Sequence, residues 1–474
     1  MLLKNKAKKG GITVLIFTII QTGTSLLTQV VLLRLIEPDV FGKLAMAMFI
    51  VMIFATIFNS QGDKYIIQTK ENVNEKINVI ITLELILAIV FIIIVSSLAP
   101  VITKLNGRED LTLIIQLLSL IFLAIPFQKI RSGLEKDLFM FKSYIAAYFS
   151  QLIGGILAVV LALNDFGIYA LIAWTIATQI LDVIALLFIT KFRIKFILSK
   201  KIITEMYSFS FPIISASILV YFVWNVDYYI VAYFKDYTEV GYYWLAFQAS
   251  HYLLNTKTMI NSVLFPTFAH PKSNAEKYEM FDLVIRLTAP IYTLPALIIL
   301  IFGKYFIVII YGEKWLPALI PFKIFLIIVV VKAIGSNAGP LLYSLGKTVQ
   351  DFKLGIINAI TLPILVVIGT YYYGIAGAAA GVLVSAGLNA FYGFYKYIKP
   401  ETKKSAYYYY HKALLLLSLV WCVLLIKNNL LGIDNLYFDS IFLTISCFVY
   451  FLIFRTELTR LVNIVFAKSK IRDE

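Results

Sequence analysis

The stretch I-N-V-I-I-T-L-E-L-I-L-A-I-V-F-I-I-I-V-S-S-L-A-P-V at residues 77–101 decides the fold, because its 25 residues carry one charge, Glu84. A helix of this length exceeds the ~30 Å thickness of the hydrocarbon core of a bilayer. Similar apolar runs recur along the 474-residue chain, in which 60% of residues are hydrophobic and only 15% are charged. A soluble protein carries more charge to cover its surface. The sequence therefore predicts an all-α polytopic membrane protein.

Fourteen membrane-spanning helices can be placed between the loops that carry the charges. They are predicted at residues 12–33, 44–61, 77–101, 111–128, 143–163, 168–190, 207–231, 241–266, 281–302, 318–343, 354–372, 376–395, 413–427 and 439–454. The last two are the shortest, so a twelve-span chain with an interfacial C-terminal pair is the alternative. The first run lacks a small-residue cleavage site, which favours a retained helix over a signal peptide.

Basic residues are distributed unequally between alternate loops. Of 42 Lys and Arg, 31 fall on the side of the N-terminus, 8 fall on the opposite side, and Lys257, Lys323 and Lys332 lie within spans. Cytoplasmic loops retain Lys and Arg, so we expect cytoplasmic N- and C-termini. The same rule explains the formal net charge of +15, which therefore implies no nucleic-acid partner. Cys422 and Cys447 lie in apolar segments, so no disulfide framework or metal site is predicted.

Short motifs recur in the two halves of the chain. L-I-E-P-D-V-F-G-K-L-A-M-A, ending at Ala47, parallels F-K-D-Y-T-E-V-G-Y-Y-W-L-A, ending at Ala246, so that Gly42 corresponds to Gly241 at an offset of 199. Two further motif pairs follow in the same order, which predicts two six-helix bundles repeated in parallel, as in transporters. The expected domains are residues 1–200, residues 201–396, and two extra helices with a basic cytoplasmic tail at residues 397–474.

Three predicted helices carry polar side chains along one face, which is unfavourable in lipid unless that face meets protein or water. The first span includes Gln21, Ser25 and Gln29, and the eighth includes Gln248, His251, Asn255 and Thr258. The seventh carries a looser stripe. These faces predict a hydrophilic cavity between the two halves. The alternative for any single Ser or Thr is a bond between helices or to its own backbone.

Charged residues inside the spans are functional candidates by default. Among them, Lys257, Lys332 and Asp227 are the candidate binding residues, and the lysines could contact an anionic substrate. Structural pairing is the alternative for Glu84 and Asp182. Lys323 lies near the end of a span, where its side chain can reach the interface.

The chain resembles one family in several motifs that follow in order. They are L-L-R-L-I-E-P-D-V-F-G (32–42), N-S-Q-G-D-K-Y-I-I-Q (59–68), L-E-K-D-L-F-M-F-K (134–142), V-D-Y-Y-I-V (226–231), V-L-F-P-T-F (263–268), G-E-K-W-L-P-A (312–318) and L-L-Y-S-L-G-K (341–347). This pattern, over roughly residues 10–395, is similar to the Wzx-like polysaccharide and lipopolysaccharide exporters (flippases) of the multidrug/oligosaccharidyl-lipid/polysaccharide (MOP) exporter superfamily.

The resemblance implies that a polyprenyl-diphosphate-linked oligosaccharide, such as an O-antigen, capsule or exopolysaccharide repeat unit, crosses the bacterial cytoplasmic (inner) membrane by alternating access. It implies a MATE-like V-shaped pair of bundles with spans one, two, seven and eight around the cavity. Basic residues in the cavity would bind the diphosphate, with Arg34 and Lys257 as the counterparts here. The second span carries no basic residue, which departs from a strongly cationic cavity.

The resemblance further implies membrane lipids and other polysaccharide assembly proteins as partners, no cofactor, and coupling to an H+ or Na+ gradient or to the membrane potential. The alternative function is that of a cation-coupled small-molecule antiporter of the MATE type, which predicts clustered acidic residues deep in one half. A membrane-embedded glycan polymerase or ligase is a third reading. It would need a sizeable outer loop or convergent carboxylates, and because the sequence offers neither, we expect no enzyme.

Overall fold

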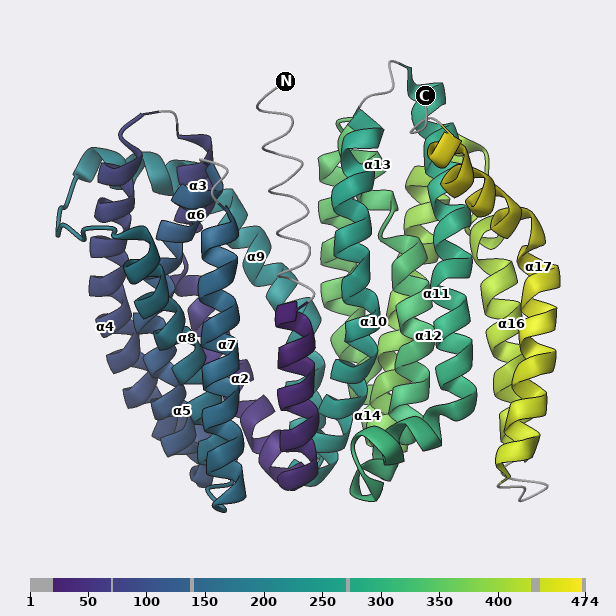
Figure 1. Ribbon diagram of the computed structural model, residues 1–474, viewed down its shortest axis with the longest axis horizontal. Coiled ribbons are helices and arrows are strands. Elements are labelled where there is room, and N and C mark those ends of the chain that lie inside the picture. The colour runs from purple at the N-terminus through teal and green to yellow at the C-terminus, as the bar shows by residue number, and fades with distance from the viewer. Residues whose placement is uncertain (1–19, 70, 137–139, 270–272, 428–434, 471–474) are drawn as a thin grey trace. The chain divides into compact units, whose positions relative to one another are not determined.

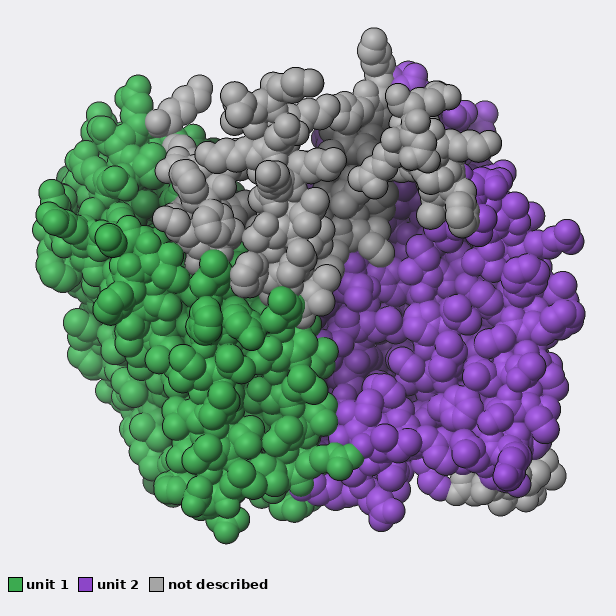
Figure 2. Space-filling model, in the orientation of Figure 1, with its two compact units in different colours: residues 1–241 green, residues 242–474 purple. Residues whose placement is uncertain are grey.

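A computed structural model describes residues 20–69, 71–136, 140–269, 273–427 and 435–470, which are helical apart from short connections and contain no strand (Figure 1). Side chains are described in these ranges except at residues 134–136, 140–143, 258–269 and 464–470. The chain divides into two compact units, Met1–Gly241 and Tyr242–Glu474, coloured green and purple in Figure 2. The all-α membrane fold predicted from the sequence is confirmed.

Unit 1 contains long apolar helices joined by short amphipathic ones. After a helix at residues 20–35, its elements are α2 (Pro38–Phe58), α3 (Gly62–Gln68), α4 (Val73–Leu105), η1 (Glu109–Leu111), α5 (Thr112–Leu118), η2 (Ser119–Leu123), η3 (Ile125–Phe127), α6 (Gln128–Lys136), α7 (Met140–Leu163), α8 (Ile168–Thr190), α9 (Lys200–Phe234) and the start of α10 (Tyr237–Ala269). The predicted fourth span is therefore α5 followed by 3-10 turns. Pro126 lacks a backbone N–H and lies at the start of the second turn.

Unit 2 continues α10 and adds the helices of the second half. They are α11 (Asn274–Ile310), η4 (Glu313–Ala318), α12 (Leu319–Gly335), α13 (Ala338–Ser344), α14 (Thr348–Gly393), η5 (Phe394–Ile398), α15 (Lys399–Thr402), α16 (Ala406–Ile426) and α17 (Leu436–Lys470). The last two lie side by side and contain the predicted C-terminal spans (Figure 1). Lys427, directly after α16, and Asp439, near the start of α17, form an ion pair of 2.5 Å.

Helix α14 is a helical hairpin. Tyr373 and Gly374 have non-helical backbone angles, and Gly374 has a φ of +59° that favours glycine. Beyond this break the chain folds back, so that a Cβ atom on Gly369 would lie 2.1 Å from the carbonyl oxygen of Gly377. The two arms coincide with the eleventh and twelfth predicted spans.

Each of the fourteen predicted spans falls mainly on helical residues in the part that the structure describes. Eleven helical stretches in the described ranges are long and apolar enough to cross a membrane, and one of them, Thr348–Thr402, includes both arms of α14. The structure is thus consistent with fourteen spans. The domain boundaries at residues 200 and 396 follow the sequence repeat and stay a prediction.

Candidate functional site

Lys257 is held at the C-terminal end of α12. Its side chain is 4% exposed, and its ammonium group donates to the carbonyl oxygen of Ala333 and to the hydroxyl group of Ser336. The last carbonyl groups of a helix have no partner within the helix and carry partial negative charge, so they stabilise a cation. Unit 2 therefore contains a membrane-embedded lysine whose charge is offset by a helix end rather than by a carboxylate.

Two other predicted residues belong to the same region of unit 2. Lys332 precedes Ala333 on α12, is partly exposed, and interacts electrostatically with His251 on α10. His251 also stacks on Phe247, with ring centroids 4.0 Å apart. The structure thus brings Lys257, Lys332 and His251 together where α10 lies near the end of α12. Like charges in a low-dielectric region favour the binding of an anion.

The cluster includes a residue that sequence analysis missed. Asn337 is 2% exposed, and its amide group donates to the carbonyl oxygens of Ala333 at 3.2 Å and Ile334 at 3.1 Å and to Thr288 at 3.5 Å. Its amide group therefore shares the helix end with Lys257. The run G-S-N directly after the apolar part of α12 is a helix-end signal that could have located it.

The remaining polar residues of α10 differ in exposure. Gln248 is partly buried and Asn255 is exposed in the described chain. Thr256, next to Asn255, contacts the hydroxyl group of Tyr292 on α11 at 3.0 Å. Thr258 lies in α10, but its side chain falls outside the described residues. The predicted stripe therefore has both solvent-accessible and packed members.

The candidates of unit 1 are more dispersed. Gln29 is 6% exposed, whereas Gln21 and Ser25 on the same helix are partly exposed. Arg34 lies at the end of this helix with an exposed side chain. Asp227 is 2% exposed on α9. The role of these four residues and of Asp227 in substrate binding stays a prediction.

A fully buried ion pair joins α4 and α6 in unit 1. Lys129 and Glu84 are 1% and 0% exposed, and their charged groups lie 3.3 Å apart. The carboxylate of Glu84 also accepts hydrogen bonds from the backbone and hydroxyl group of Ser60, and Lys129 donates to Asn59 at 3.2 Å. Structural pairing thus holds for Glu84. Lys129, assigned to a loop from the sequence, is instead buried because Glu84 and Asn59 satisfy its charge.

A second pair joins the neighbouring helices of this unit. Arg131 on α6 donates two hydrogen bonds to Asp182 on α8, at 2.7 and 2.8 Å. Both bonds come from one nitrogen atom, Nη2, and both are charge-assisted. Glu84 and Asp182 are therefore both paired with basic residues. Among the described residues, no group of three or more His, Cys, Asp or Glu could hold a metal ion.

Solved structures with a similar fold are transporters. A lipid II flippase MurJ in an inward closed conformation aligns with a TM-score of 0.72 and 15% identity, covering 94% of this chain and 98% of that one. An inward-facing multidrug resistance MATE family transporter of the MOP superfamily aligns with a TM-score of 0.63 and 13% identity, covering 81% and 96%. These likenesses establish the MOP-type fold.

Sequence comparisons are more specific. The lipopolysaccharide biosynthesis protein WzxC of Escherichia coli K12 is 25% identical over 406 residues, which cover 84% of this chain and 82% of that protein. The teichuronic acid biosynthesis protein TuaB of Bacillus subtilis 168 is also 25% identical, over 62% of each chain. The profile of the family described as "Polysaccharide biosynthesis protein" matches residues 31–320, more than half of the sequence. This multi-pass membrane protein therefore belongs to the polysaccharide biosynthesis protein family.

Proposed function

We propose that this protein is a flippase that moves a polyprenyl-diphosphate-linked oligosaccharide across the bacterial cytoplasmic membrane. The match of residues 31–320 to the polysaccharide biosynthesis protein family carries the proposal. The names of its relatives support it, since they include a lipopolysaccharide biosynthesis protein and a succinoglycan biosynthesis transport protein of Rhizobium meliloti. The fold shared with a lipid II flippase agrees with a lipid-linked load.

The physical problem is that such a load has two incompatible parts. A diphosphate and a glycan cannot enter hydrocarbon, whereas the polyprenyl chain is most stable there. A hydrophilic cavity open to lipid on one side would enclose the head group while the polyprenyl tail stays in the bilayer. Repeated helical bundles can alternate access to such a cavity. No bond has to be made or broken, and no cofactor is required.

The cations at the end of α12 provide the contact for the diphosphate in this proposal. Lys332 is partly exposed, and the ammonium group of Lys257 contacts the carbonyl group of Ala333, the residue after Lys332. An anion bound here would relieve the repulsion between the two lysine charges. Arg34, exposed at the end of the first helix, is a further candidate for binding the diphosphate. The polar residues Gln21, Ser25, Gln248, His251 and Asn255 would contact the sugar.

The proposed topology has cytoplasmic termini, as 31 of the 42 basic residues favour. Transport would draw on an H+ or Na+ gradient or on the membrane potential, and other polysaccharide assembly proteins would supply and remove the load.

Deletion of the gene tests the proposal in cells. We expect surface glycan to disappear while its lipid-linked precursor accumulates, and the wild-type gene on a plasmid to restore both. Normal surface glycan in a strain without a second exporter would contradict the proposal. Loss of resistance to small cations with normal glycan would instead support a MATE-type antiporter.

A further inference from the structure

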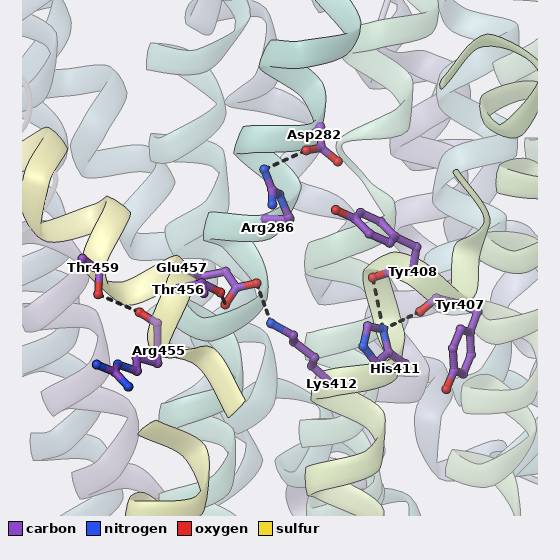
Figure 3. A network of polar contacts seen from close by, with 10 residues as sticks. All are labelled: Asp282, Arg286, Tyr407, Tyr408, His411, Lys412, Arg455, Thr456, Glu457 and Thr459. Atoms are coloured by element: carbon purple, nitrogen blue, oxygen red, sulfur yellow. Dashed lines mark hydrogen bonds and ion pairs between the residues drawn. The ribbon is translucent and has the colours of Figure 1, made fainter. Parts of the chain in front are cut away.

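A cavity of about 690 Å³ lies at the N-terminal end of α11 in unit 2. Its walls come from α11, from the chain around the start of α16, and from α17. Figure 3 shows part of this region, with Asp282 and Arg286 on α11 and with Lys412 on α16 paired to Glu457 on α17 at 2.7 Å. This last pair ties α16 to α17 and so keeps the α17 wall in place.

The charged groups that line the cavity are sorted by sign along α11. Glu276 and Glu279 come first, and Arg286 follows Glu279 after seven residues, or about 10 Å of helix. Asp282 lies between two cations, since its carboxylate is 2.9 Å from Arg286 and 2.6 Å from Lys404. Because one carboxylate faces two cations, the part of the cavity around Asp282 carries net positive charge. The cavity is therefore negative at one end and positive at the other.

Two of the lining side chains have no other role in the described part of the chain. Glu279 and Arg460 are both exposed, and neither has an ion pair or hydrogen bond through its side chain with a described residue. Arg460 on α17 lines the cavity together with Arg286. The positive end thus offers a guanidinium group with free donors, and the negative end offers a free carboxylate.

The positive end lies at the boundary of the membrane. Residues 287–303 of α11 carry no charge, and on α17 the 15 residues between Asp439 and Arg455 carry none either. Arg286 and Arg460 are therefore close to the ends of the apolar segments, where lipid phosphate groups lie. A smaller adjoining cavity is lined by Arg286 and Arg460 with Leu283, Leu287, Thr456 and Glu457. The carboxylate of Glu457 is already neutralised by Lys412. The acidic end, by contrast, is directed away from the apolar segment of α11.

We propose that this cavity binds a phospholipid whose head group carries a phosphate and a primary ammonium, as in the ethanolamine class. The phosphate contacts Arg286 and Arg460 near the hydrocarbon, and the ammonium contacts Glu276 and Glu279 on the water side. Both contacts are charge-assisted hydrogen bonds. A purely anionic head group would be repelled by the two glutamates, and a quaternary choline group has no N–H to donate to them.

Native mass spectrometry of the purified full-length protein tests this site. The protein is titrated with phosphatidylethanolamine, phosphatidylcholine or phosphatidylglycerol of identical acyl chains, and the retained lipid is counted. We expect the ethanolamine lipid to bind about tenfold more tightly than the other two, as befits one charge-assisted hydrogen bond at the ammonium. Arg460→Gln should weaken its binding about tenfold, and Glu279→Gln should remove the preference over choline.

Arg455→Gln is the matched control, because Arg455 is exposed on the same helix, lies one and a half turns from Arg460 and does not line the cavity. It should bind the ethanolamine lipid like the wild type. Equal retention of phosphatidylcholine or phosphatidylglycerol by the wild type would overturn the proposal. So would unchanged binding by both Arg460→Gln and Glu279→Gln. The site does not depend on the transported load, so these outcomes leave the proposed flippase function untouched.

Discussion

Gly42 and Gly241, which occupy equivalent positions in the repeated motifs, pack against each other. A Cβ atom on Gly42 would lie 1.9 Å from the carbonyl oxygen of Tyr237, and one on Gly241 would lie 2.0 Å from that of Pro38. Pro38 and Tyr237 each lie four residues before the glycine of their own motif, so the contact is reciprocal. The sequence repeat is therefore expressed in unit 1 as a two-fold crossing of the first turns of α2 and α10.

Substitution at this crossing should destabilise the protein. Gly42→Ala and Gly241→Ala each force backbone apart, and we expect each to lower the free energy of unfolding by about 1–3 kcal/mol. The measurement is the thermal unfolding temperature of the purified protein. Gly387→Ala is the control, because nothing lies within 4 Å of an added Cβ there. An unchanged unfolding temperature in both variants would show that the two helices can move apart without lowering the stability of the protein.

The same crossing is braced by the connection between α4 and η1. Arg108 donates to the carbonyl oxygens of Ala232 at 2.9 Å and Lys235 at 2.7 Å, and its guanidinium group stacks over the ring of Tyr237. Arg108→Lys cannot reproduce this two-carbonyl contact with a planar group. We expect it to lower the unfolding temperature, but by less than Gly42→Ala. A larger effect than that of the glycine variant would mean that the loop, and not the crossing, holds these helices.

The Glu84–Lys129 pair makes a double-mutant cycle informative. Lys129→Met leaves a buried carboxylate unpaired and should lower stability by about 3–5 kcal/mol, and Glu84→Leu should do the same to the lysine. The double variant removes both charges, so we expect it to be more stable than either single variant. Thermal unfolding of the four proteins checks this. Strictly additive losses would show that the two groups act independently.

The lysines at the end of α12 should matter for transport more than for folding. We expect Lys332→Gln and Lys257→Gln to reduce export of surface glycan about tenfold or more at normal protein abundance, since each removes a charge that would meet the diphosphate. Glutamine keeps an N–H donor for the carbonyl group of Ala333. Lys323→Gln is the control, because Lys323 is a buried lysine at the other end of the same helix. Wild-type export by both variants would exclude these lysines from the substrate site.

The orientation can be checked by labelling single cysteines in a variant in which Cys422 and Cys447 are serine. Glu109→Cys and Arg193→Cys both place an exposed thiol in a loop of unit 1. An impermeant thiol reagent added to intact cells should label position 109 and should label position 193 only after the membrane is opened. The reverse pattern would invert the proposed topology.

The spans were predictable from the sequence because the requirement for an apolar helix of membrane length acts on each segment separately. The break at Tyr373 and Gly374 was located as well, since two apolar runs meet at a glycine there. The 3-10 geometry after α5 was not predicted, because hydropathy does not distinguish a regular helix from a tighter one. It follows from local backbone geometry near Pro126.

Contacts between side chains on different helices are harder to predict from the sequence. Glu84 was identified as an intramembrane charge, but its partner Lys129 lies 45 positions away in a segment that its composition assigns to a loop. Likewise, Lys257 was singled out by its position, whereas its contacts are a backbone carbonyl group and Ser336. A sequence shows which groups need a partner, but the pairing depends on how the helices pack.

Transfer of the substrate by the purified protein tests the central claim most directly. The full-length protein is reconstituted in vesicles that contain a fluorescent polyprenyl-diphosphate-linked oligosaccharide, and a glycosidase added outside reports the fraction that is accessible. We predict that the fraction of substrate cleaved by the glycosidase rises from the part present in the outer leaflet to nearly all of it. Lys332→Gln should slow this rise. Accessibility that stays at the outer-leaflet share, with correctly folded protein and the substrate of its own cell, would contradict the account.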